Sequence, residues 1–229
     1  MLNIDFKRGP AALLIAGAFL ISFSSVLVRL SHVPPTVSAF YRVFFGGLCL
    51  LPLCVIKKDI RSRGVKNNLL AVACGFFFSL DLAFWHISIL YVGPGIATLL
   101  SNFQVFILTG AGVFFYREKL HPLFLLSVPA AVAGLFLLIG VDMGQVSPQY
   151  LKGIGFGLAT ALMYSLFLLL IRKLQSDRIH YSKFYYQMIL SLVCAGFLGA
   201  GILIQGESFV IPDLQTLLAL ISLGVGIQA

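Results

Sequence analysis

Two charged side chains, Arg42 and Asp81, lie well inside long apolar stretches of this sequence. A charge near the centre of a bilayer costs about 2.5 to 3.5 kcal/mol on insertion scales, so such a residue usually has a partner or a function. At a rise of about 1.5 Å per helical residue, Arg42 lies roughly 9 Å and Asp81 roughly 13 Å below the same membrane boundary. We predict that the two residues form an ion pair or share a polar cavity. Either this site binds a solute or a proton, or the pair only fixes helix packing.

Trp85 and His86 follow Asp81 by about one helical turn. Asp81 and Trp85 are four residues apart, so they share a helix face. A tryptophan beside a carboxylate could form one wall of a site for a cationic or aromatic solute. The alternative is an interfacial tryptophan that anchors the helix. His86 either relays protons or is merely solvated at the interface.

Three uncharged polar residues complete the candidate solute pathway. Asn102 and Gln104 lie close together in one apolar stretch, and Tyr164 shares a helix face with Thr160 in another. Such residues either line a hydrated cavity or join helices through hydrogen bonds that average about 0.6 kcal/mol. Two amides in one span favour the polar pathway.

The stretches that carry these residues are long enough to cross a membrane. Hydrophobic residues make up 59% of the 229 residues and charged residues only 10%, whereas a soluble domain carries about 25% charged residues. A spanning helix needs about 20 mostly apolar residues. An eighth, shorter stretch runs from near Asp213 to Ala229. Seven stretches qualify in full: Pro10–Leu30, Thr36–Ile56, Asn68–Val92, Gly93–Tyr116, Leu120–Val141, Lys152–Arg172 and Tyr185–Gln205.

This pattern predicts an all-α fold, a polytopic transmembrane helix bundle. The stretches do not alternate polar and apolar residues with period two, so strands are excluded. The first stretch is too long for a signal peptide, which predicts a retained helix. Pro34-Pro35 and Gly93-Pro94-Gly95 make tight connections, and these predict that adjacent helices pack antiparallel.

Basic residues predict the orientation. The net charge is +8, and most of the 16 Lys and Arg residues lie in connectors that face the same side if the N-terminus is cytoplasmic. This distribution follows the positive-inside rule, so it indicates membrane topology rather than nucleic-acid binding. We predict a multi-pass protein of the cell (cytoplasmic) membrane, with the lipid bilayer as its surroundings and no nucleic-acid partner.

Sequence motifs for other chemistry are not found. The four cysteines, Cys49, Cys54, Cys74 and Cys194, lie inside apolar stretches without a CxxC pair, which argues against a disulfide framework or a zinc site. The sequence contains neither HExxH nor a phosphate-binding GxxxxGK[ST] motif. We predict no enzyme activity, no metal and no cofactor.

An internal repeat is suggested by two short matches. Phe40-Tyr41-Arg42 resembles Phe184-Tyr185-Tyr186, and Ser25 to Arg29 resembles Ser165 to Arg172. A unit of five helices that is repeated once must be inverted, because five is odd. Inverted repeats are common in secondary transporters.

Three local patterns resemble the drug/metabolite transporter superfamily, specifically its EamA-type members. They are Leu90 to Leu100, rich in small residues, Phe114 to Leu120, which contains Glu118, and the glycine-containing stretch from Gly134 to Val141. The resemblance implies ten helices in two inverted five-helix halves, with residues 1–141 as the first repeat and 142–229 as an incomplete second repeat. It also implies a gating or structural role for Glu118. The alternative is that Glu118 only forms a local ion pair with Arg117 and Lys119.

The chain departs from that family pattern in two places. Asn102 to Val105 occupies the region where a mid-helix proline is expected, and helices nine and ten would follow Ala229. We predict a secondary transporter that exports small polar metabolites (amino acids, amines or related solutes) by alternating access, with a small-molecule solute and a second copy, in a homodimer, as partners. The alternatives are an intramembrane enzyme, and a non-transporting structural membrane protein or truncated fragment.

Overall fold

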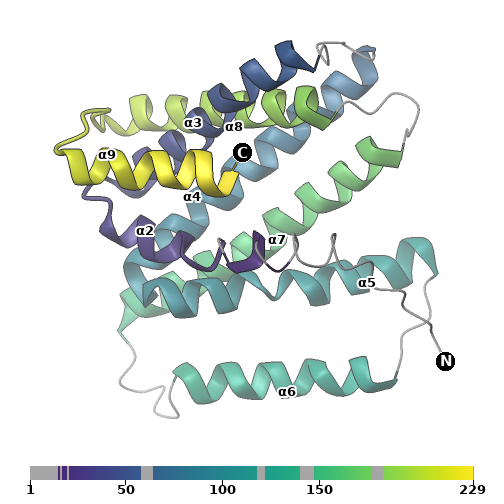
Figure 1. Cartoon of the computed structure of the whole chain (residues 1–229). Coiled ribbons are helices and arrows are strands. Elements are labelled where there is room, and N and C mark those ends of the chain that lie inside the picture. Colours follow the sequence, from purple (N-terminus) through teal and green to yellow (C-terminus); the bar gives the residue numbers. More distant parts are fainter. Residues whose placement is uncertain are drawn as a thin grey trace.

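The computed structural model describes residues 15, 17–19, 21–57, 64–117, 122–139, 147–176 and 183–228. Within these ranges all regular secondary structure is helical (Figure 1), which confirms the predicted all-α membrane bundle. In the same ranges, four helical segments are long and apolar enough to cross a membrane. The elements are α2 (Ser24–Leu30), α3 (Pro35–Ile56), α4 (Val65–Ser101), α5 (Gln104–Tyr116), α6 (Pro122–Ile139), α7 (Pro148–Ser176), α8 (Lys183–Gln205), α9 (Leu214–Ile221) and the π-helix η1 (Ser222–Gln228).

The helix α4 contains a sharp break at the predicted position. Gly93 adopts φ 81° and ψ 165°, a conformation that favours glycine, and Pro94 follows it. Residues 65–92 and 95–101 are therefore two helical segments that meet at this break. This geometry agrees with the sequence-based division between the third and fourth spans.

A second break lies where the sequence predicted one continuous span. The backbone N–H of Phe103 donates to Leu100 O at 3.1 Å, and that of Val105 donates to Asn102 O at 3.1 Å. These are contacts to the third preceding residue, which tighten the turn between α4 and α5. The predicted span over 93–116 is interrupted at this turn, although no proline stands there, and it still lies within one continuous candidate for crossing a membrane, Val65–Phe115.

The main packing partners are distant in sequence. The helix α4 packs principally on α7, and α3 packs on α8. The prediction that adjacent helices pack antiparallel concerned chain neighbours; among these, α3 and α4 are in contact, but less extensively than the two pairs above. A core of buried residues from α3, α4, α7 and α8 lies at the centre of this group, including Val43, Phe78, Phe167 and Leu198.

Glycines allow the closest approach between helices in the group formed by α3, α4, α7 and α8. A β-carbon added at Gly157 of α7 would lie 2.6 Å from Leu100 Cδ1, and one added at Gly153 would lie 2.5 Å from Tyr91 Cβ. The Ser88 hydroxyl also donates to Gly153 O at 2.8 Å. Small residues drive helix association in membranes because they let backbones come together.

The C-terminal helices pack on the N-terminal ones. The helices α2 and α9 contact each other, and η1 packs on α3. A β-carbon added at Gly224 of η1 would lie 2.6 Å from Phe45 Cβ and 2.9 Å from the Arg42 carbonyl oxygen. The backbone of η1 therefore lies directly against the backbone of α3.

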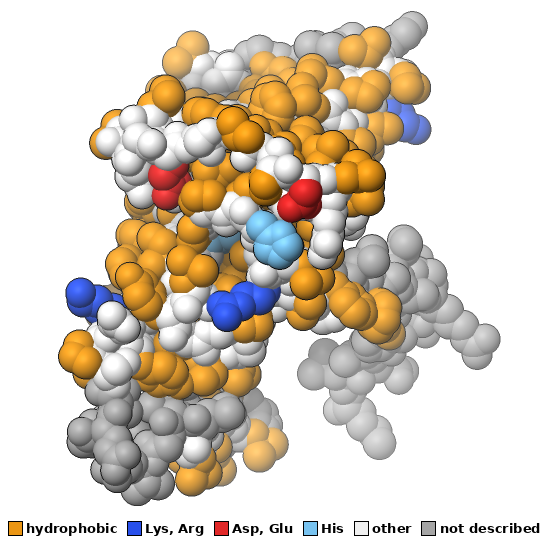
Figure 2. All heavy atoms as spheres, turned by 90° about the vertical axis from the view of Figure 1, so that its left-hand side faces the viewer, with side chains coloured by type: hydrophobic (Ala, Val, Ile, Leu, Met, Phe, Trp, Pro, Cys, Tyr) orange, Lys and Arg blue, Asp and Glu red, His pale blue; other side chains and the backbone are white. Residues whose placement is uncertain are grey.

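The surface is mainly apolar, as a lipid-facing protein requires. Figure 2 shows hydrophobic side chains over much of the described part of one face, with few charged side chains among them. The helix α6 lies at the edge of the molecule, beyond α5 (Figure 1). Its outward residues Leu123, Leu126 and Leu137 are 68%, 67% and 75% exposed.

Candidate functional site

Arg42 is held in the core by two partners from other helices. Its Nη1 donates to the Ser24 hydroxyl of α2 at 3.1 Å. Its guanidinium carbon lies 5.6 Å from the centre of the Trp85 ring, a cation–π distance. Its Nε is buried and has no hydrogen-bond partner among the described residues. One donor of this cation is therefore unused.

Asp81 is the complementary group. Its side chain is buried on α4, with a residue exposure of 6%. Arg42, Tyr164 and Cys194 lie within electrostatic range of its carboxylate. Among the described residues, however, the one ion pair within 4.0 Å joins His32 to Asp213, so Arg42 and Asp81 do not touch. The direct form of the predicted ion pair is not observed, and the two charges instead share one buried environment.

Trp85 lies beneath the Arg42 guanidinium. It also packs against the apolar cluster that contains Val28, Ile89 and Leu220. Its ring meets that of His86 edge-on at 5.2 Å between centres. The cation on Trp85 in this structure is thus a side chain of the protein itself.

His86 is fully buried, with an exposure of 0%. Its Nδ1 lies 2.7 Å from the Leu82 carbonyl oxygen, to which it donates one turn back along α4. This assignment leaves Nε2 as an acceptor, and Nε2 has no partner among the described residues. The alternative of a solvated interfacial histidine is therefore wrong, because α4 turns this face into the bundle.

Tyr164 joins the cluster from the second half of the chain. It lies on α7, tilted against Phe167 at 5.5 Å between ring centres. One turn earlier, the Thr160 hydroxyl approaches the backbone carbonyl of Asp81 at 3.4 Å. The central cluster, which we define as Arg42, Asp81, Trp85, His86 and Tyr164, thus lies where α3, α4 and α7 meet.

The two amides of the predicted pathway face different surroundings. The Gln104 side-chain Oε1 is buried without a hydrogen-bond partner among the described residues, and its backbone carbonyl lies 3.4 Å from the Ser165 hydroxyl of α7. Asn102 is exposed and lines a cavity between α5 and α6. The break between α4 and α5 separates the two side chains. Glu118, the predicted gating residue, lies outside the described residues.

Sequence reasoning missed a polar contact between the two ends of the chain. Asp213 caps α9 by accepting from the Thr216 backbone N–H at 2.6 Å, and its other oxygen lies 3.5 Å from His32 Nδ1. The hydrogen bond from Thr216 lowers the pKa of the Asp213 carboxyl below its ordinary value. The Tyr41 hydroxyl donates to Phe209 O nearby, at 2.6 Å. An aspartate directly before an apolar helix is a helix-capping signal that the sequence did contain.

The helices and the buried polar cluster define a polytopic membrane protein with a polar interior. A comparison with protein families finds that the EamA-like transporter family matches residues 9–140. The chain therefore belongs to this family, within the drug/metabolite transporter superfamily, which confirms the resemblance.

A solved structure supports the fold. It is described only as a crystal structure of a protein, and it has a TM-score of 0.64 and 20% sequence identity over 93% of this chain and 74% of that chain. A search of curated proteins gave no match.

Proposed function

We propose that the chain is a secondary transporter whose central cluster binds a small polar metabolite, such as an amino acid or an amine. One observation carries the proposal: the buried Asp81 carboxylate has no hydrogen bond to a described residue, beside Arg42 with an unused Nε donor. Buried charges of opposite sign normally meet. A pair held close but apart leaves both groups able to bind a solute that lies between them.

The position of the cluster supports alternating access. Arg42 and Asp81 come from the first half of the chain, and Tyr164 and Cys194 come from the second. A solute bound there would contact both halves, as in transporters built from inverted repeats. A two-fold axis between the proposed repeats (1–141 and 142–229) would make the α4–α7 pair equivalent to the α9–α2 pair. The helices of both pairs are in contact, so the packing supports such an axis.

The orientation and direction belong to the same proposal. The basic connectors support a cytoplasmic N-terminus in the cell membrane. Export is proposed as the direction of transport. A homodimer also remains a prediction. Labelling of a tag in residues 57–67 on intact cells tests the orientation, since a cytoplasmic connector must stay inaccessible.

A transport assay in liposomes tests the proposed function. The purified full chain is reconstituted and assayed with radiolabelled amino acids and amines, next to Asp81→Asn. We expect the flux of the transported solute to fall at least tenfold in this variant, because the amide removes the buried negative charge. Asp213→Asn makes the same chemical change at an exposed position and is expected to retain flux.

Three outcomes are informative. Equal flux by well-folded Asp81→Asn and the wild-type chain would remove the central cluster from the transport pathway. Chemical turnover of a solute without flux would favour the intramembrane enzyme. Absence of flux for every solute in the panel would favour a structural role.

A further inference from the structure

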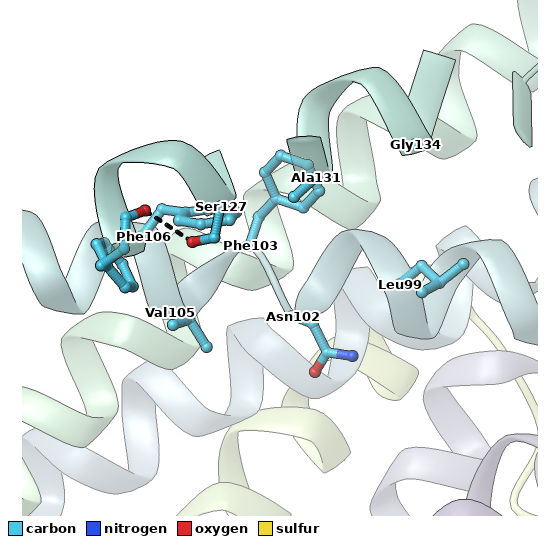
Figure 3. Close-up of a pocket in the computed structure, with 9 residues that line it drawn as sticks. Leu99, Asn102, Phe103, Val105, Phe106, Ser127, Ala131 and Gly134 are labelled. Carbon is cyan, nitrogen blue, oxygen red and sulfur yellow. Dashed lines mark hydrogen bonds between the residues drawn. The ribbon is translucent and has the colours of Figure 1, made fainter. Parts of the chain in front are cut away.

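A cavity of about 420 Å³ separates α6 from the turn between α4 and α5. Four of its lining residues, Phe124, Ser127, Ala131 and Gly134, come from α6. They are spaced by three or four residues, so they form one face of that helix. Figure 3 shows the Phe103 ring reaching toward this face.

The lining of the cavity offers almost nothing to a polar ligand. None of the described residues that line it is charged. The Ser127 hydroxyl donates to the Phe124 carbonyl of its own helix at 2.7 Å, so its hydrogen is already used. Asn102 lies at the break, and its amide points away from α6 in Figure 3.

The described lining of the cavity is almost entirely apolar, so water there would find few hydrogen-bond partners. Apolar cavities of about 150 Å³ remain dry and bind apolar molecules such as benzene. An unfilled space of this size would cost the packing contacts of every residue around it. The occupant must therefore be apolar.

We propose that the acyl chain of a bilayer phospholipid occupies this cavity and forms the main packing layer between α5 and α6. The helix α5 lies within a segment that is long and apolar enough to cross a membrane, and α6 is an apolar helix of 18 residues whose Leu126 is exposed. Acyl chains are the apolar molecules present at high concentration there. Phe106 and Phe124 approach each other at 6.1 Å between ring centres and border the cavity. This inference does not depend on the transport activity.

Photo-labelling tests the proposal. The full chain is placed in phospholipid nanodiscs that contain a small fraction of phospholipid with a diazirine on its acyl chain, and labelled peptides are mapped after irradiation. We expect adducts to concentrate on the α6 face of Ser127, Ala131 and Gly134. Gly134→Leu places a side chain in the cavity, where it competes with an acyl chain, and is expected to lower these adducts severalfold.

The glycines of the chain supply a matched control. A β-carbon added at Gly134 or at Gly110 meets no atom within 4 Å, so both leucine variants are compatible with the fold. Gly110 is exposed on α5 and does not line the cavity. Gly110→Leu is expected to keep the wild-type labelling. Ala131→Leu is a second cavity-filling variant, should Gly134→Leu not fold.

Two results would overturn the proposal. The first is equal labelling of this face in the wild-type chain and in a folded cavity-filling variant. The second is a mass of two chains per nanodisc for the wild type that becomes one chain in Gly134→Leu, because this result assigns the cavity to a second copy.

Discussion

The α4–α7 interface and the α5–α6 pair use similar apolar helices, but they are built in opposite ways. Gly153 and Gly157 bring α7 against Tyr91 and Leu100 with no room for a methyl group. Between α5 and α6 a cavity of about 420 Å³ replaces such contacts, and Gly134 has open space around it. In lipid, helices associate through close packing rather than through the hydrophobic effect. The same residue type therefore marks a rigid contact in one region and a loose one in the other.

The polar cluster lies in the closely packed region. Asp81 and His86 are on the part of α4 that meets α7 and α8, and Arg42 is on α3, which meets α8 and η1. Close packing keeps Arg42 over Trp85 and keeps water from Nε2 of His86. The comparison teaches that the candidate site depends on contacts between the two halves of the chain and not on α6.

The largest expected effect comes from breaking the closely packed interface. In Gly157→Leu the added β-carbon alone would lie 2.6 Å from Leu100 Cδ1, so α7 must move away from α4. Overpacking of a rigid contact typically costs 1 to 3 kcal/mol, and we expect about 3 kcal/mol here, measured as a loss of unfolding free energy in detergent.

The control for this variant lies two residues away on the same helix. Gly155 is exposed, and a β-carbon added there meets no atom within 4 Å. Gly155→Leu should therefore unfold like the wild-type chain. If both leucine variants lost the same stability, the glycine contact with α4 would not be the cause.

An intermediate effect is expected at the contact between the chain ends. The pKa of Asp213 is lowered by the hydrogen bond from Thr216, so the charged form stabilises the fold. A lowered pKa gives stability that is present above the ordinary aspartate pKa and is lost as the pH falls through the lowered value. Asp213→Asn should thus have a lower Tm than the wild type at neutral pH, and this difference should shrink in acid.

Two variants separate the contributions to that effect. Asparagine still caps a helix, so Asp213→Asn tests the charge and not the cap. His32→Gln removes the imidazole near Asp213 and leaves the hydrogen bond from Thr216, so most of the acid dependence should remain. A Tm difference between Asp213→Asn and the wild type that did not change with pH would contradict the role of the carboxylate charge.

The smallest effect is expected on the outward face of α6. Leu126 is 67% exposed, whereas Leu100 is 0% exposed in the α4–α7 contact. Leu126→Ala should change the unfolding free energy by no more than about 0.5 kcal/mol, and Leu100→Ala should cost about 2 to 5 kcal/mol. Similar losses for the two variants would show that α6 packs as tightly as α7.

The four spanning segments of the described residues were predictable from sequence, because long apolar runs with few charges favour membrane helices. Glycine and proline also gave the break at Gly93, because glycine tolerates the positive φ that other residues avoid and proline lacks a backbone N–H donor. The break at Asn102-Phe103 was not predictable, because neither residue forbids a helix. Beside it, the Ser165 hydroxyl of α7 lies 3.4 Å from the Gln104 carbonyl oxygen, a tertiary contact that the sequence does not reveal.

The candidate site was predictable as a set of residues but not as a geometry. Burial of charge in an apolar span singled out Arg42 and Asp81, and depth along each helix placed them at a similar level. The depth of a residue in the membrane does not say in which direction around the helix axis its side chain points. It also does not say which other side chain it contacts. Ser24 and Trp85 hold the guanidinium, and this arrangement decides that the two charges stay apart.

The π-helix η1 gives Arg42 a second anchor, on its backbone. Gly224 lies so close to the Arg42 carbonyl that a side chain there would collide with it. A displacement of η1 along α3 must therefore carry the Arg42 backbone with it or open a gap beside it. The location of Arg42, the one cation in the central cluster, is therefore mechanically linked to η1, which lies far from it in the sequence.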